Sequence, residues 1–208
     1  MAASPRPTRP RLRERYDRRQ EAVVRAAARV FAQRGYDQTT IQELAESIDL
    51  AAGGIYHYVG SKEQLLELIC DQLMAPLLEA ARALLEDVAE PDEQLRALVR
   101  LWVQHVTEHR DHMLVFQQER HVIERGARWR RIREDRKRFE LMLEGLIAPL
   151  HAAGRLAVAD ERLAIAALLG MVNHTAQWYR PRGRLSPAQI ADGYVDLLLG
   201  AGGPLRGR

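Results

Sequence analysis

The sequence predicts an all-α protein with a small N-terminal helical head and a larger C-terminal helical body. Ala, Leu, Arg and Glu are abundant, whereas Val and Ile are sparse beside them, and this balance favours helices. Apolar residues also recur three and four positions apart, which is the spacing of one face of a helix. Pro and Gly gather at the chain ends and at the expected turns.

The length and the charge of the chain limit what it can be. A chain of 208 residues can bury a core in one or two domains. Its net charge is only +3, but residues 1–62 hold 11 Lys and Arg against 7 Asp and Glu, whereas the rest holds 20 against 21. The basic excess therefore lies in the N-terminal part, as binding to nucleic-acid phosphates would require.

Membrane and secreted proteins are excluded by the sequence. No stretch approaches the roughly 20 apolar residues of a membrane span, and the N-terminus lacks the apolar core of a secretory signal. The single cysteine, Cys70, excludes an internal disulfide and a cysteine-based zinc cluster. We therefore expect a cytoplasmic protein without a membrane partner.

The inventory of reactive residues argues against an enzyme. Seven histidines are present, but no HExxH, no GxSxG and no phosphate-binding glycine loop occurs. His105 and His109 have the i,i+4 spacing of a helical metal site, yet no third ligand lies nearby. We expect no catalytic residues, no metal and no cofactor.

The head contains the pattern of a helix-turn-helix. Thr40 and Glu43 have the spacing of a capping box at the start of a short helix, which ends before Asp49. A second short helix, residues 52–59, carries Tyr56 and His57 but little aliphatic bulk, so these side chains remain available to a partner. In a helix-turn-helix this second helix enters the major groove of DNA.

Other local signals place the surrounding elements. The first helix is expected from about Glu14 to Arg34, with Gly35 as its C-terminal cap. Ser61 opens a long fourth helix, in which Pro76 predicts a kink or break near Met74. The body helices are expected at residues 92–109, 111–124, 127–153, 160–180 and 187–200, with Gly154 ending the third and Ser186 capping the last. We thus predict a disordered basic arm (1–12), a helix-turn-helix domain (13–60), an effector-binding and dimerisation domain (61–200) and a flexible tail (201–208).

Polar and aromatic residues interrupt otherwise apolar body helices. Apolar walls with a few convergent polar groups are typical of a small-molecule pocket. The alternative is that some of these residues are surface groups and others are core polar groups with satisfied hydrogen bonds. The candidate effector-binding residues are Trp102, His105, Phe116, Gln117, Arg120, Asn173, His174, Gln177 and Trp178.

The last two helices carry apolar seams interleaved with small residues that allow close helix approach. Such helices either cover the chain's own core or pair with a second copy, and a helix-turn-helix gains affinity from pairing on a palindromic site. The candidate homodimer residues are Ile165, Leu168, Leu169, Val172, Ile190, Tyr194, Leu197 and Leu198.

The segment from Phe31 to Lys62 resembles the DNA-binding domain of the tetracycline-repressor (TetR) family. The resemblance rests on the pairs and runs Gly35-Tyr36, Thr39-Thr40, Ile55-Tyr56-His57-Tyr58 and Gly60-Ser61-Lys62. It implies a dimeric transcriptional repressor on a palindromic double-stranded DNA operator, with a dimer interface from the last two helices. The implied DNA contacts are Thr39, Thr40, Gly53, Tyr56, His57 and Lys62. The chain departs from the family pattern at Ala51, Ala52 and Gly54.

Residues 168–199 resemble a C-terminal domain of a TetR branch that controls the breakdown of fatty acids, steroids or aromatic acids. The matching residues include Asn173, Trp178-Tyr179-Arg180 and Gly183. The resemblance implies an acyl-CoA or related lipid as the effector, with Arg120, Arg180, Arg182 and Arg184 as available partners for its phosphates. Two alternatives remain open, namely an efflux-type repressor that senses drugs and an architectural DNA-binding protein without an effector.

Overall fold

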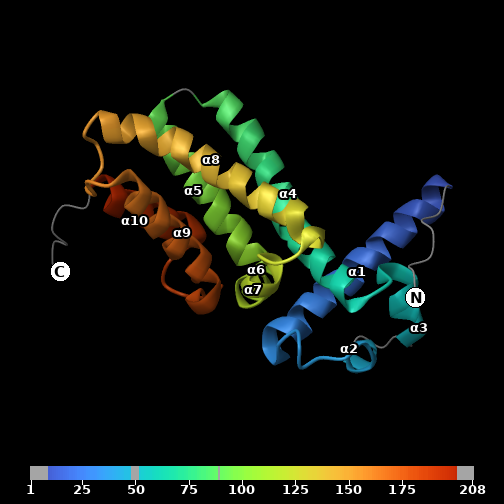
Figure 1. The fold of residues 1–208 in the computed structure, drawn as a ribbon. Helices are drawn as coiled ribbons and strands as arrows, with labels where there is room; N and C mark the ends of the chain where they lie inside the picture. The colour runs from blue at the N-terminus through green and yellow to red at the C-terminus, as the bar shows by residue number, and fades with distance from the viewer. Residues whose placement is uncertain (1–8, 48–51, 89, 201–208) are drawn as a thin grey trace. The chain divides into compact units, whose positions relative to one another are not determined.

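The structure is a computed structural model that describes residues 9–47, 52–88 and 90–200 (Figure 1). Among these residues every regular element is a helix, which confirms the all-α prediction. The elements are α1 (Pro10–Arg34), α2 (Ile41–Ser47), α3 (Ala52–Val59), α4 (Lys62–Asp87), α5 (Pro91–Glu108), α6 (Arg110–Gln118), α7 (Arg120–Ile123), the 3-10 helix η1 (Ala127–Trp129), α8 (Arg130–Ala152), α9 (Glu161–Trp178) and α10 (Pro187–Leu199).

Capping signals set several helix ends. Gly35 ends α1 at a φ of 87°, and its amide donates to the Phe31 carbonyl at 2.8 Å. After α8, Gly154 has a φ of 64° and Arg155 donates to the Leu150 carbonyl, which is a Schellman ending. Ser186 starts α10 with a complete capping box. These three predictions are confirmed because each depends on local chemistry.

Two helix predictions differ from the structure. Helix α1 begins at Pro10, because proline suits the first turn of a helix, so part of the predicted disordered arm is helical. Helix α4 runs unbroken past Pro76, so the predicted break near Met74 is wrong. The buried side chains of Leu73 and Leu77 on the two sides of the proline offset the lost backbone hydrogen bond.

The chain divides into two compact units. The head unit comprises the chain up to Leu73 together with Asp111–Ile132, and the body unit comprises Met74–Arg110 and the chain from Arg133 onward. The head unit therefore contains more than the predicted residues 13–60. It takes in the first half of α4 and the whole stretch from α6 to η1.

The core of the head unit is built from segments far apart in the sequence. Helices α1, α2, α3 and α4 each contribute fully buried apolar residues, among them Phe31, Leu44 and Ile55. The stretch from α6 to η1 contributes Val115, Ile123 and Trp129 to this cluster, and the start of α8 completes it with Ile132. The two short helices α2 and α3 are thus held by a core that a later part of the chain completes.

The body unit packs α5 against α9 and α10. Trp102 of α5 is buried, and its ring meets Phe139 of α8 edge-on, with the ring centroids 4.8 Å apart. This packing accounts for the apolar face of α5, because the aromatic pair fills the space between α5 and α8.

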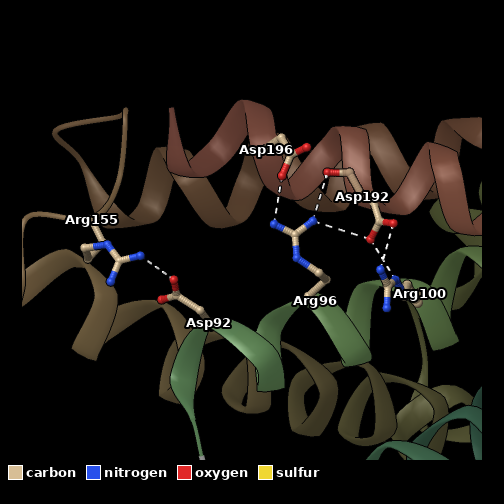
Figure 2. A network of polar contacts seen from close by, with 6 residues as sticks. All are labelled: Asp92, Arg96, Arg100, Arg155, Asp192 and Asp196. Carbon is tan, nitrogen blue, oxygen red and sulfur yellow. Dashed lines mark hydrogen bonds and ion pairs between the residues drawn. The ribbon is translucent and has the colours of Figure 1, made fainter. Parts of the chain in front are cut away.

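Figure 2 shows ion pairs that tie α10 to α5. Arg96 Nη2 lies 2.8 Å from Asp196 Oδ1, and Arg100 Nε lies 2.7 Å from Asp192 Oδ1. The hydrogen bond from Arg100, and a further one from Arg96, hold the pKa of Asp192 below its ordinary value. Each partly exposed pair contributes roughly 0.2–1 kcal/mol, so the pairs fix the register of α10 more than they stabilise the fold.

Candidate nucleic-acid interface and effector region

The recognition helix α3 has one buried side and one accessible side. Ile55 and Val59 are fully buried in the head core, whereas Gly53 and His57 are exposed and Tyr56 is half-buried. The predicted DNA-contacting residues of α3 therefore lie where a partner can reach them. A Cβ placed on Gly53 would meet no atom within 4 Å, so packing inside the chain does not require glycine there.

Helix α1 anchors the C-terminal end of α3. Tyr16 Oη donates to the His57 carbonyl at 3.2 Å, and Gln20 Nε2 donates to the Tyr58 carbonyl at 2.7 Å. The last carbonyls of a helix have no partner within it, so these two side chains supply what α3 lacks. The Tyr16 ring also lies 5.7 Å from the His57 ring and 5.2 Å from the Tyr58 ring.

Tyr16 and Gln20 were not singled out from the sequence. One signal was available, because Tyr16, Gln20 and Val23 are spaced by four and three residues and share one face of α1. The pattern shows which face is inward. It does not show that the partner is the end of α3.

The two neighbouring threonines have different roles. Thr39 is only 1% exposed, and its hydroxyl donates to the Gly35 carbonyl at 2.8 Å. Its side chain is thereby committed to the fold, and the predicted DNA contact from Thr39 is withdrawn. Thr40 is exposed and forms the predicted capping box. Its amide donates to Glu43 Oε2 at 2.8 Å, and its hydroxyl accepts from the Glu43 amide at 3.1 Å.

Lys62 lies at the first position of α4, half-exposed and next to an aromatic ring. Its Nζ is 4.2 Å from the centroid of the Tyr36 ring, a cation–π contact that holds the ammonium group in place. Burial, and then the nearby carboxylate of Glu63, raises the pKa of Tyr36 to about 12, so the ring stays neutral. Ala51 and the side chain of Ala52 lie outside the described residues.

Glu119, between α6 and α7, is a buried carboxylate at the base of the head. It is 6% exposed, and its Oε2 has no hydrogen-bond partner among the described residues. Burial raises the pKa of Glu119, the negative charge of Asp37 raises it further, and a hydrogen bond from the Tyr36 backbone lowers it. The charged form is therefore costly at this junction between the α6–η1 stretch and the segment that leads into α2.

The predicted effector residues do not come together in one unit. Phe116 packs against the head core, Gln117 lies in the head unit, and Arg120 is exposed and pairs with Glu124 at 2.7 Å. The predicted set therefore combines residues of the head unit with residues of the body unit, and it stays a prediction. Trp102 is a core residue of the body, and His105 is buried and stacked on His109 at 4.2 Å.

A surface hollow of about 540 Å³ lies in the body unit where α9 ends. Three of its lining residues are arginines, and Gln177 is the predicted effector residue that lines it. Arg110 is held by a hydrogen bond of 2.8 Å from its Nε to the Ala176 carbonyl. Guanidinium groups that converge on a hollow favour an anionic ligand. The lining residues are Arg110, Gln177, Tyr179, Arg180, Pro181 and Arg182.

The remaining predicted effector residues lie on α9. Asn173 is half-buried, His174 is exposed, and Trp178 is 45% exposed directly after Gln177. Of the four arginines considered for phosphates, Arg180 and Arg182 line the hollow.

Most of the predicted dimer seam is used inside the chain. Five of its residues are buried in the protomer and cannot contact a second copy while this fold is kept: Ile165, Leu168, Val172, Ile190 and Leu198. Leu169 is half-buried, as is Tyr194, whose hydroxyl lies 2.9 Å from that of Thr175. Leu197 of α10 is 66% exposed, and Leu163 of α9 is 59% exposed. The apolar period was correct, but it marked the inner side of both helices.

Residues 9–47, 52–88 and 90–200 contain neither a candidate membrane span nor a candidate metal site. No helix in these ranges is long and apolar enough to cross a membrane. In the same ranges, no three residues among His, Cys, Asp and Glu form a group that could hold a metal ion.

Two family models match the chain. The model of bacterial regulatory proteins of the tetR family matches residues 23–69, and that of the tetracyclin repressor-like C-terminal domain matches residues 88–201. The chain belongs to the tetR family. It is therefore a helix-turn-helix transcriptional regulator and not an enzyme.

Similar proteins match the chain over different lengths. The structure of AibR in complex with isovaleryl coenzyme A and operator DNA is 31% identical, covers 87% of this chain and 98% of its own, and has a TM-score of 0.74. The transcriptional repressor KstR2 of Mycobacterium tuberculosis (strain ATCC 25618 / H37Rv) is 24% identical over 183 residues, 88% of this chain and 92% of its own. The transcriptional regulator BetI of Rhizobium meliloti (strain 1021) is 36% identical over 83 residues, 40% of this chain and 41% of its own.

The buried carboxylate predicts a pH-dependent stability. The pKa of Glu119 is raised in the folded state. The protonated carboxyl therefore contributes stability at low pH, and this contribution is lost as the pH rises through the pKa that Glu119 has in the folded state. Glu119→Gln keeps an acceptor for the Tyr36 amide without the charge, so it should stabilise the fold by roughly 1 kcal/mol near neutral pH. Thermal unfolding measured between about pH 4 and 8 checks this.

The matched control is Glu21→Gln on the exposed surface of α1, which should change neither the melting temperature nor its pH dependence. Identical pH profiles for the wild type and Glu119→Gln would contradict the assignment of the cost to this carboxylate.

Proposed function

We propose that the chain is a homodimeric repressor that binds a palindromic operator and is released by a CoA thioester. The observation that carries the proposal is the similarity to AibR, whose solved complex holds isovaleryl coenzyme A and operator DNA, over nearly the full length of both chains. The arginine-lined hollow at the end of α9 supports it independently, because it offers cations to an anionic effector.

The DNA side of the proposal uses the accessible face of the head. Tyr56 and His57 of α3 contact base edges or phosphates, with Gly53 permitting a close approach of the backbone. Thr40 and Lys62 flank the helix and contact the phosphate backbone, where the ammonium group of Lys62 contributes a charge. Two such heads in a dimer read half-sites centred roughly 10 bp apart.

The effector side uses the hollow of the body unit. Coenzyme A carries a diphosphate and a sugar phosphate, and Arg110, Arg180 and Arg182 provide guanidinium groups of matching charge and geometry. The exposed Trp178 next to Gln177 supplies an aromatic surface beside them. A free acid has a single carboxylate and so engages only part of this arginine cluster, whereas an uncharged drug forms no ion pair with it.

Arg110 gives the proposed release a physical route. It lines the hollow, and the next residue, Asp111, begins the stretch that packs into the head core. A ligand that draws Arg110 away from the Ala176 carbonyl would favour a different setting of α6. The effector then acts by binding that state more tightly than the operator-bound state.

The proposed dimer uses the outward face of α9 and α10. Leu163 and Leu197 are the exposed large residues of this face, and Gly170 and Gly193 between them leave room for close helix approach. The interface thus replaces the buried seam predicted from the sequence.

Operator binding and its release can be tested together by fluorescence anisotropy on the chain's own upstream DNA. Isovaleryl-CoA should release the bound fragment, and free isovalerate should not. Arg182→Gln should bind the operator normally but require at least about tenfold more thioester, because one charged hydrogen bond is lost. Tyr56→Ala and Lys62→Ala should weaken binding of the operator itself.

The control for this assay is Arg162→Gln, an exposed arginine of α9 that does not line the hollow. Release by free acids or hydrophobic drugs, but not by thioesters, would favour an efflux-type repressor. If the wild type binds no fragment of the upstream DNA, the repressor proposal is rejected.

The dimer face can be tested by light scattering coupled to gel filtration. Leu197→Glu places a charge in the proposed interface and should convert the dimer to a monomer. Leu141→Glu is the matched control, because Leu141 is 52% exposed on α8, away from the proposed interface. A Leu197→Glu chain that remains a dimer would place the interface elsewhere.

A further inference from the structure

The first turns of α1 carry a dense set of arginines. Between residues 9 and 19 there are six arginines and two acidic residues, Glu14 and Asp17. All six arginines are exposed, and the leucine among them, Leu12, is 49% exposed, so Tyr16 is the buried apolar residue between Arg9 and Arg19. The arginines are Arg9, Arg11, Arg13, Arg15, Arg18 and Arg19.

Helix geometry sorts these arginines by face. The face of α1 that meets α3 is marked by Tyr16 and Gln20, which bond the last carbonyls of α3. Residues three, four and seven apart share a face, so Arg13 and Arg9 continue this stripe beyond Tyr16 toward the start of the helix. At about 100° per residue, Arg11 and Arg18 point roughly 140° and 160° away from Tyr16.

The stripe adjoins the accessible side of the recognition helix. The Tyr16 ring contacts the ring of His57, which is an exposed residue of α3 and one of the proposed DNA contacts. Arg13 and Arg9 follow roughly 4.5 and 10 Å further along the α1 axis. They therefore lie next to the proposed DNA surface, one helical turn apart.

We infer that Arg9 and Arg13 bind the phosphate backbone of duplex DNA that flanks each half-site. The inference rests on the proposed function and adds a second contact surface to it. One DNA strand carries a charge about every 3.4 Å of axis, so two guanidinium groups a helical turn apart each reach a phosphate. Their contacts carry no base information, and they extend the footprint beyond the bases read by α3.

The test compares two double variants with the same loss of charge on the same helix. Arg9→Gln with Arg13→Gln removes the stripe next to α3, and Arg11→Gln with Arg18→Gln removes two arginines from the opposite face. Anisotropy titrations at several salt concentrations give the slope of log K against log [salt] for each protein. The first variant should reduce the magnitude of that slope by about 1.8, since each phosphate contact contributes about 0.9.

The control variant should keep the wild-type slope. The stripe variant should also lose affinity by the same factor on the operator and on a duplex with scrambled half-sites, because backbone contacts do not depend on sequence. When the flanking base pairs are trimmed, the wild type should fall to the affinity of the stripe variant.

The outcomes separate this inference from the proposed function. Equal slopes for the two double variants overturn the inference, because only net charge would then matter. An unchanged affinity of the wild type on the trimmed operator overturns it as well. Failure of the wild type to bind any upstream fragment instead rejects the proposed function, and the inference falls with it.

Discussion

The recognition helix depends on packing that a later part of the chain provides. Helices α2 and α3 have seven and eight residues, and helices this short are not stable without tertiary packing. Their buried residues join a cluster that Val115, Ile123 and Trp129 of the α6–η1 stretch complete, together with Ile132 at the start of α8. The DNA-binding surface is therefore a property of the assembled head unit and not of its N-terminal residues alone.

The same stretch holds a buried carboxylate whose charged form is costly. Glu119 is buried with an orphan oxygen and a raised pKa, next to the Tyr36 backbone that leads into α2. At its other end the stretch begins directly after Arg110, a lining residue of the hollow. The α6–η1 stretch thus supports α3, carries a buried carboxylate and starts next to the proposed effector site. This combination suits it to respond to a ligand. The hydrogen bonds from Tyr16 and Gln20 of α1 hold the C-terminal end of α3, in addition to the buried core.

Local features of the fold followed from the sequence, and long-range ones did not. Gly35, Gly154 and Ser186 were correctly read as helix ends, because caps depend on neighbouring residues alone. Leu168 was predicted at the dimer interface but is buried inside the protomer, since an apolar stripe shows which face of a helix is buried but not what covers it. Thr39 and Thr40 were predicted to act alike, but the Thr39 hydroxyl donates to the Gly35 carbonyl four residues earlier, a bond that the residue types alone did not indicate.

Hydrogen–deuterium exchange of Trp129→Ala, read by mass spectrometry, tests the dependence of the head on the α6–η1 stretch most directly. Removing the indole leaves a cavity that costs about 3–5 kcal/mol, and local opening should follow where that packing is lost. The account predicts faster exchange in α1, α3 and the first half of α4, with α5, α9 and α10 unchanged. Trp102→Ala, a buried tryptophan of the body, should give the reverse pattern. Unchanged exchange of α1 and α3 in Trp129→Ala would contradict the account.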